Sequence, residues 1–154
     1  MSVNTIDVKK LREETGAGIL DCKKALDESK GDYKKALDII TKKGLAKAAK
    51  KLDRSTSQGI IETYIHGGGK IGVMLELLCE TDFVARNSDF KKLAHELCLH
   101  IVAMDPRNIE ELLKQNYVRD MSATIEDLVK KNIARIGENI VIGRFVRMNL
   151  GVEN

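Results

Sequence analysis

Two histidines in the stretch HELCLH come closest to a catalytic metal site, but their spacing argues against one. Metalloprotease histidines lie at i and i+4, on one face of a helix. His95 and His100 are five residues apart, which places them about 140° apart around a helix, so one metal ion cannot readily bind both. Because Leu97 and Ile101 belong to an apolar stripe, we expect His100 at the surface or at the boundary of the core.

A run of three glycines followed by lysine suggests a phosphate-binding loop, and this interpretation also fails on spacing. The nucleotide-binding form requires a glycine five residues before the last glycine, and a serine or threonine after the lysine to bind Mg²⁺. Around Gly69 and Lys70, those two positions are occupied by Tyr64 and Ile71. We therefore expect residues 67–69 to form a turn between strands.

The three cysteines, Cys22, Cys79 and Cys98, are widely separated and form neither a Cys-x-x-Cys metal pair nor a disulfide framework. Cys22 and Cys79 fall on predicted apolar faces, where a thiol serves as a small hydrophobic side chain. The spacing of the third histidine, His66, indicates no Ser–His–Asp or Cys–His arrangement. The sequence thus predicts no catalytic residue, no metal site and no cofactor, and we expect a protein that is not an enzyme.

Composition and charge narrow the class of protein further. Of the 154 residues 43% are hydrophobic, and 26 Lys and Arg against 23 Asp and Glu give a net charge of +3. This balance is too even for a nucleic-acid-binding arm, and the chain is too apolar for disorder. No apolar run approaches the ~18 residues of a membrane span, and the first residues do not resemble a signal peptide. We expect a cytoplasmic protein that binds neither membranes nor nucleic acid directly.

The first part of the chain has the pattern of a small helical domain. The first of three expected helices ends at Gly16, and the second spans about residues 19–29. The third follows Asp32, a good N-cap, and stops at Gly44. A basic linker helix is expected over residues 45–54. The inward residues of the second helix are expected to be Ile19, Cys22, Ala25 and Leu26.

The hydrophobic period then changes from helical to alternating. Residues 60–66 and 70–79 alternate on either side of the glycine turn, which predicts an antiparallel hairpin. The elements expected next are a helix from Ser88 to Pro106, a short helix to about Lys114, a helix that Thr124 and Asp127 open and Gly137 closes, and a strand over residues 140–150. The fold class is therefore α+β: a three-helix domain with its linker in residues 1–54, and a core of helices on a small antiparallel sheet of about three strands in residues 55–154.

Residues 79–87 stand out because they place an aromatic side chain in a connection between a strand and a helix. Phe83 follows Asp82 in the sequence CETDFVARN. In one interpretation Phe83 closes the end of the core and Asp82 caps a helical turn. In the other, Phe83 is an exposed ring that enters a pocket of a partner with a carboxylate beside it, because such anchors concentrate binding energy. Composition alone favours the first interpretation.

Three segments resemble the signatures of the elongation factor Ts family. They are LREETGAGILDCKKAL at residues 11–26, TDFVARN at residues 81–87 and IGENI at residues 136–140. The segments keep the order of the family, and the resemblance extends from residue 3 to residue 151. It implies a short form of the family, with a three-helix domain of the ubiquitin-associated type in front of the α+β core.

The resemblance implies guanine-nucleotide exchange on elongation factor Tu, with the GDP-bound and the nucleotide-free GTPase as partners. By position, Phe83 would wedge between two helices of the GTPase near its magnesium site, and Asp82 would be the adjacent polar contact. Thr81 and Val84, on either side of this pair, would belong to the same interface. The chain itself would hold no cofactor.

Two further groups of residues are implied to contact elongation factor Tu. Ile136 and Gly137 would lie beside the wedge on the same surface. The residues that match the family's contacts with the GTP-binding domain are Arg12, Ile19, Leu20 and Lys23. Leu20 also lies off the inward stripe of its predicted helix, which agrees with a contact role.

The sequence departs from many members of the family, which carry a second core half, often with a coiled-coil hairpin; no such segment is found here. Some short relatives pair into dimers, and the exposed edges of a three-stranded sheet also suggest a homodimer. Two other functions stay open. One is an adaptor that binds peptides or ubiquitin-like partners through the three-helix domain alone, and the other is an RNA-binding translation accessory that uses residues 42–54.

Overall fold

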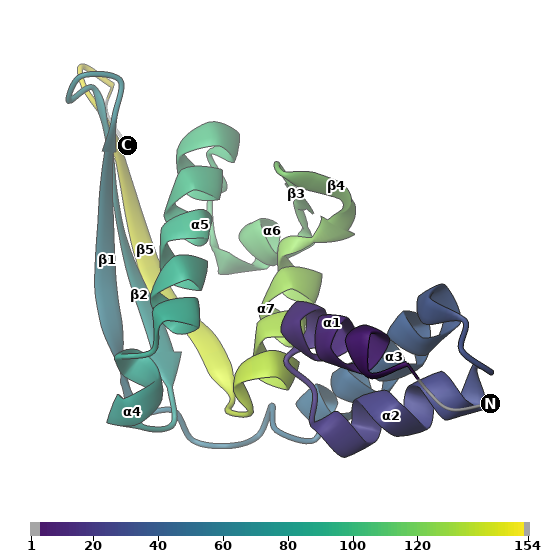
Figure 1. Cartoon of the computed structure of the whole chain (residues 1–154). Helices are drawn as coiled ribbons and strands as arrows, with labels where there is room; N and C mark the ends of the chain where they lie inside the picture. The colour runs from purple at the N-terminus through teal and green to yellow at the C-terminus, as the bar shows by residue number, and fades with distance from the viewer. Residues whose placement is uncertain (1–3, 153–154) are drawn as a thin grey trace.

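The computed structural model describes residues 4–152, and its N-terminal part is a bundle of three helices (Figure 1). These are α1 (Thr5–Thr15), α2 (Ile19–Glu28) and α3 (Tyr33–Ala49). Asp32 caps α3 by accepting a hydrogen bond from Lys35 N at 3.1 Å, and Gly16 ends α1 with a φ of +70°, as predicted. The bundle has a small core of its own, formed by Leu11, Cys22, Ala25, Leu26, Ala36 and Ile40.

Gly44 does not stop the third helix, so this expectation is wrong. α3 continues through it, and no separate linker helix forms over residues 45–54. The glycine instead lets α3 approach α7 (Ile125–Ile136), because a Cβ at Gly44 would lie 3.2 Å from the Cβ of Ala134. One turn further on, Ala48 is buried in the larger core of the molecule. The end of α3 therefore packs on the rest of the chain.

The predicted hairpin and third strand are confirmed. The strands are β1 (Gln58–His66), β2 (Ile71–Cys79) and β5 (Ile140–Asn149). They form an antiparallel sheet in the order β1-β2-β5, in which Thr63 pairs with Met74 and Met74 with Val146. Residues 67–69 turn the hairpin with positive φ angles of +62°, +68° and +91°, which glycine adopts without strain.

Helices cover one face of this sheet (Figure 1). They are α4 (Asp82–Ala85), α5 (Ser88–Met104), α6 (Ile109–Lys114) and α7. α7 begins with the predicted capping box, because Thr124 Oγ1 accepts from Asp127 N at 3.1 Å and Asp127 Oδ2 accepts from Thr124 N at 3.0 Å. The larger core lies between the helices and the sheet, so the α+β fold class is confirmed. The division of the chain at residues 54–55 stays a prediction.

A two-stranded ribbon, β3 (Asn116–Tyr117) with β4 (Asp120–Thr124), was not predicted. It changes the environment of His100, which is fully buried rather than at the surface or core boundary. His100 Nε2 lies 3.0 Å from Gln115 Oε1, and Val118 N lies 3.4 Å from Nδ1. Burial lowers the pKa of His100 below its usual value of 6.5, so the ring has a structural role.

Within residues 4–152, no helix is long and apolar enough to cross a membrane.

Candidate functional site

Phe83 lies on the surface, on the first turn of a very short helix. It is 78% exposed, so the interpretation in which it closes the core is wrong. Thr81 rather than Asp82 caps the four-residue α4, and its Oγ1 accepts a hydrogen bond from Val84 N at 3.4 Å. Ala85 is buried, and the half-buried Val84 packs against the larger core. The contacts that anchor α4 therefore leave the aromatic ring directed outward.

An ion pair accompanies the exposed ring. Arg86 Nη2 lies 2.5 Å from Asp82 Oδ2, and the guanidinium is 5.7 Å from the centroid of the Phe83 ring. Because both charged side chains are exposed, the pair contributes only about 0–1 kcal/mol to stability. A partner can therefore replace Arg86 with another contact, and the ring and the carboxylate are presented together.

The segment before α4 is bound by a carboxylate from a distant part of the chain. Glu138 Oε2 accepts hydrogen bonds from Glu80 N at 3.2 Å and Thr81 N at 3.0 Å. Glu138 Oε1 accepts from Thr81 Oγ1 at 2.6 Å. In return, Glu80 Oε1 accepts from Asn139 N at 2.7 Å. These four bonds join Glu80 and Thr81, directly before α4, to the turn that follows α7.

That turn, which contains Ile136 and Gly137, also binds the connection between α3 and β1. Gly137 ends α7 with a φ of +92°, and its carbonyl oxygen accepts a hydrogen bond from Lys51 Nζ at 2.7 Å. The buried Asn139 donates from Nδ2 to two carbonyl oxygens of the connection, those of Leu52 at 3.1 Å and Arg54 at 2.8 Å. The turn therefore links the helical bundle to the segment before α4, and it brings Ile136 and Gly137 close to Thr81.

A second group of candidate residues lies on α1 and α2. Leu20 is 73% exposed and Ile19 is 55% exposed, and Arg12 and Lys23 are exposed as well. The expectation that Ile19 faces inward is wrong, because Ala17 packs against that end of the small core instead. Two exposed aliphatic side chains at the start of α2, with the exposed cations Arg12 and Lys23 on the same two helices, give this part of the surface an apolar and basic character.

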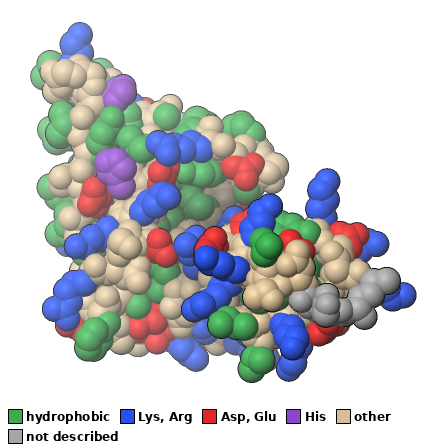
Figure 2. Space-filling model, viewed as in Figure 1, with side chains coloured by type: hydrophobic (Ala, Val, Ile, Leu, Met, Phe, Trp, Pro, Cys, Tyr) green, Lys and Arg blue, Asp and Glu red, His purple; other side chains and the backbone are tan. Residues whose placement is uncertain are grey.

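The two groups lie along one edge of the molecule. In the view of Figure 1, α4, the turn after α7 and the start of α2 occupy the lower edge, with the connection between α3 and β1 passing between them. Figure 2 shows hydrophobic side chains that protrude at this edge over α4 and over the start of α2, with Lys and Arg side chains around them. The fold thus brings α4, which carries Phe83, and the turn after α7 together, and it places the α1–α2 group further along the same edge.

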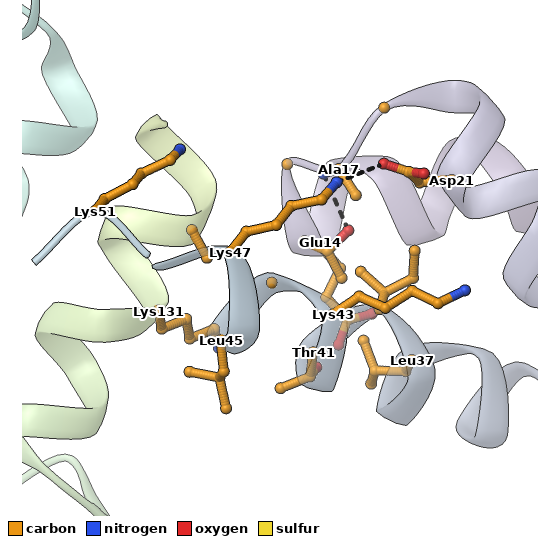
Figure 3. A pocket seen from close by; sticks show the side chains of 16 residues that line it. Glu14, Ala17, Asp21, Leu37, Thr41, Lys43, Leu45, Lys47, Lys51 and Lys131 are labelled. Carbon is orange, nitrogen blue, oxygen red and sulfur yellow. Dashed lines mark hydrogen bonds and ion pairs between the residues drawn. The ribbon is translucent and has the colours of Figure 1, made fainter. Parts of the chain in front are cut away.

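A hollow of about 390 Å³ lies between the helical bundle and α7, but it contains none of the predicted contact residues. Several lysines line it (Figure 3). Lys47 Nζ lies 3.1 Å from Asp21 Oδ2, and Lys43 Nζ lies 3.2 Å from Glu28 Oε1. Lys51 is bound to the carbonyl of Gly137. Three of the lysines that line the hollow, Lys43, Lys47 and Lys51, therefore already have partners within the chain.

The cysteines are buried, as two of them were predicted to be. Burial raises the pKa of Cys22 and Cys79, and it raises the pKa of Cys98 to about 12. The thiols are therefore neutral near pH 7 and poor nucleophiles. In the described part of the chain, no three His, Cys, Asp or Glu side chains gather to hold a metal ion.

Comparison with known proteins decides the family. The sequence model of the family described as "Elongation factor TS" matches residues 80–154. Elongation factor Ts of Fervidobacterium nodosum is 43% identical, with 98% of this chain and all of that protein aligned, and that of Coprothermobacter proteolyticus is 44% identical over the same shares. That of a Thermoanaerobacter strain is 41% identical over 94% of this chain and 93% of its own. The chain belongs to the elongation factor Ts family.

Membership of the elongation factor Ts family assigns the chain to the elongation phase of protein biosynthesis. The alignments with the first two relatives extend over 196 residues, although this chain has only 154. Because 196 − 154 is 42, there are at least 42 positions of the alignment at which the relative has a residue and this chain has a gap. This is consistent with the short form that the sequence indicates.

Sequence reasoning missed the residues that support the candidate contacts. Glu138 and Asn139 lie inside the family signature IGENI, but only Ile136 and Gly137 of that signature were assigned a role. Lys51 was assigned to a basic linker helix and to the residues of the RNA-binding alternative, and its bond to the turn after α7 was not anticipated. The signal that could have found Glu138 and Asn139 is a charged and an amide side chain directly after a helix-ending glycine, next to a buried strand.

Proposed function

We propose that the chain is a guanine-nucleotide exchange factor that promotes GDP release from elongation factor Tu by inserting the Asp82–Phe83 turn near the magnesium and phosphate site of the GTPase. The observation that supports this is a 78% exposed ring on a helix anchored from its other side. Burial of such a side chain in a partner's pocket gains about 1.5–3 kcal/mol. The activity makes and breaks no covalent bond, and it requires that the chain share the cytoplasm with elongation factor Tu.

The exchange reaction follows from thermodynamic linkage. The exchange factor and the nucleotide each weaken the binding of the other by the same factor. Phe83 therefore promotes GDP release only if the cleft that it enters is more open in the empty GTPase than in the GDP-bound form. Loss of magnesium, which Asp82 and Phe83 would favour by disturbing its site, removes charge stabilisation of the phosphates. The chain itself holds neither nucleotide nor metal in this mechanism.

The α1–α2 group would provide the docking contact. Ile19 and Leu20 offer apolar area, and Arg12 and Lys23 offer charges at its rim, which contribute more to the association rate and orientation than to affinity. Docking here would hold elongation factor Tu while the wedge acts some distance along the same edge. Thr81, Val84, Ile136 and Gly137 would form the remaining contacts around the wedge.

Substitution of the ring tests this function. Phe83→Ala should slow the release of fluorescent GDP from elongation factor Tu by about 30-fold, because truncation of a central aromatic anchor costs about 2 kcal/mol or more. The melting temperature should not change, since the ring is exposed. Met121→Ala, at a residue that is 62% exposed on β4, is the matched control. A folded Phe83→Ala variant that exchanges GDP at the wild-type rate would exclude the wedge and favour the adaptor function.

We also propose that a second copy of the chain covers the open face of the sheet. The large apolar side chains on this face that are more than half exposed are Ile61, Ile65, Met74, Val146 and Met148. They come from all three strands, so the apolar surface is continuous and not confined to the edge strands. The charges toward one end of this face, Glu76 and Arg144, pair with each other at 3.5 Å. A face whose exposed side chains are mostly apolar, and whose charges pair with each other, can pack against itself around a two-fold axis.

The oligomeric state tests this pairing. The wild-type chain should sediment as a dimer at micromolar concentration, and Met74→Lys should produce a folded monomer because it buries an unpaired charge in the centre of the face. Met121→Lys is the matched control and should stay dimeric. A wild-type chain that sediments as a monomer at 100 μM or above would refute the pairing.

A further inference from the structure

We infer that Glu138 is a positioning residue that holds the Phe83 wedge ready for insertion; this inference rests on the proposed exchange function. The helix that carries Phe83 has only four residues. Such a helix is not stable by itself, because the first turn fixes several residues for a single hydrogen bond. Its conformation therefore depends on contacts from other parts of the chain.

Glu138 supplies polar contacts that determine how the helix begins. Its carboxylate accepts hydrogen bonds from two successive backbone N–H groups, those of Glu80 and Thr81, and from the Thr81 hydroxyl at 2.6 Å. Because the hydroxyl donates its proton to Glu138, its lone pairs are available to the N–H of Val84, which lies 3.4 Å away. The carboxylate thus orients the cap of α4 through Thr81.

The other contacts of α4 cannot replace the hydrogen bonds that Glu138 accepts. Val84 and Ala85 pack against the core and fix the depth of the helix, but apolar packing does not define the direction of a single turn as hydrogen bonds do. The ion pair of Asp82 with Arg86 is exposed and joins only the first residue of α4 to the residue that follows it. Hydrogen bonds to an ionised carboxylate are about twice as strong as neutral ones. Glu138 comes from a turn 57 residues further along the chain than Thr81, and it supplies three of the four hydrogen bonds that join the segment before α4 to that turn.

A loosened wedge would affect one kinetic parameter more than the other. If the insertion-competent conformation is present for only a fraction of the time, the rate of GDP release within the complex falls to that fraction of its full value. Docking through α1 and α2 does not involve α4, so the concentration of exchange factor needed for half-maximal rate should change little. A residue that only stabilises the fold would lower the melting temperature without this selective loss of maximal rate.

The test compares variants of the full chain with fluorescent GDP on elongation factor Tu. Glu138→Ala should lower the maximal release rate about tenfold, equivalent to about 1.4 kcal/mol, with KM changed less than twofold. Glu138→Gln should recover most of the rate, because its amide oxygen still accepts from both N–H groups. The matched control is Glu96→Ala, which removes a half-buried carboxylate bound by Tyr117 and Arg119 at the distant ribbon, and it should lower stability alone.

Amide hydrogen exchange of the free chain provides a readout that does not depend on elongation factor Tu. The amides of Ala85 and Arg86 donate to the carbonyls of Thr81 and Asp82, each at 3.2 Å, and not to Glu138. They should exchange at least tenfold faster in Glu138→Ala and should be unchanged in Glu96→Ala. If Glu138→Ala does not fold, Thr81→Val, which replaces the hydroxyl with a methyl group, should show the same faster exchange and lower maximal rate.

The outcomes separate this inference from the proposed function. A normal maximal rate in Glu138→Ala or Thr81→Val, with an impaired Phe83→Ala, overturns the role of Glu138 and leaves the exchange function intact. Unchanged protection of Ala85 and Arg86 overturns it as well. If Phe83→Ala also exchanges normally, the proposed function itself is wrong.

Discussion

Truncation of Leu20 should weaken binding to elongation factor Tu without affecting the fold. Leu20 is 73% exposed at the start of α2, so nearly three quarters of its surface remains available for burial by a partner. Leu→Ala removes three carbon atoms, each worth about 0.8 kcal/mol when fully buried. Scaled by the exposed fraction, the loss is at most about 1.8 kcal/mol. We expect about 1.4 kcal/mol, which is a tenfold higher Kd.

The assay is a titration of nucleotide-free elongation factor Tu by isothermal calorimetry, with thermal unfolding of each variant in parallel. Leu150→Ala is the matched control, because this leucine is 75% exposed and follows β5 at the opposite end of the molecule (Figure 1). Leu20→Ala should raise Kd tenfold and Leu150→Ala should not, with both melting temperatures within about 1 °C of the wild type. Equal Kd values for Leu20→Ala and the wild type would show that the α1–α2 surface is not the docking site.

Two further predictions concern the residues that support the site. Asn139→Ala should lower the free energy of unfolding by about 2–3 kcal/mol in urea titrations, because two hydrogen bonds of a buried side chain are lost. The control Asn132→Ala removes one bond to its own helix and should lower the free energy of unfolding by less than about 1 kcal/mol. Equal losses in the two variants would contradict the reasoning. Burial lowers the pKa of His100, so below about pH 6.5 the unfolded chain binds a proton that the folded chain does not. The free energy of unfolding should therefore fall as the pH decreases from about 7.5 to about 5.5. His100→Gln should reduce this fall, and an unchanged pH dependence would show that the ring is accessible to protons in the folded chain.

Much of the fold was predictable because its signals are local. The alternation on both sides of residues 67–69 defined the hairpin, and Thr124, Asp127 and Gly137 marked the two ends of α7. Each of these signals depends on residues within one turn or one strand of each other. Gly44 shows the limit of this reasoning. A glycine that ends a helix and a glycine that lets two helices approach look alike in sequence, and only the position of Ala134 on α7 distinguishes them.

The burial of His100 was missed for a similar reason. Its place on the helix, off the stripe of Leu97 and Ile101, suggested the surface. The ribbon formed by β3 and β4 covers that side of α5, but its strands have only two and five residues. Segments this short carry no measurable period, so neither the ribbon nor its effect on His100 could be predicted from the pattern.

The candidate site was predictable only in part. The resemblance identified Asp82 and Phe83, whereas composition favoured a buried ring, because an aromatic residue between a strand and a helix suits either environment. Glu138 and Asn139 were missed because their partners lie 57 to 87 residues away in the chain. Hydrogen bonds between distant segments leave no periodic signal, and a single sequence does not show which polar residues meet.

Three close approaches between the helical bundle and the region of α7 bear on how the two candidate contact groups could act together. A Cβ at Gly16 would lie 2.6 Å from Arg135 Cγ, a Cβ at Gly44 would lie 3.2 Å from Ala134, and Lys51 binds the carbonyl of Gly137. These approaches leave little freedom for the bundle to move relative to the wedge. When two contacts belong to one rigid body, the second forms without further loss of translational or conformational freedom. In the proposed exchange function, the free energy gained at Leu20 would then be available to offset the opening of the cleft that Phe83 enters, whereas a flexible connection would consume part of it in ordering the chain.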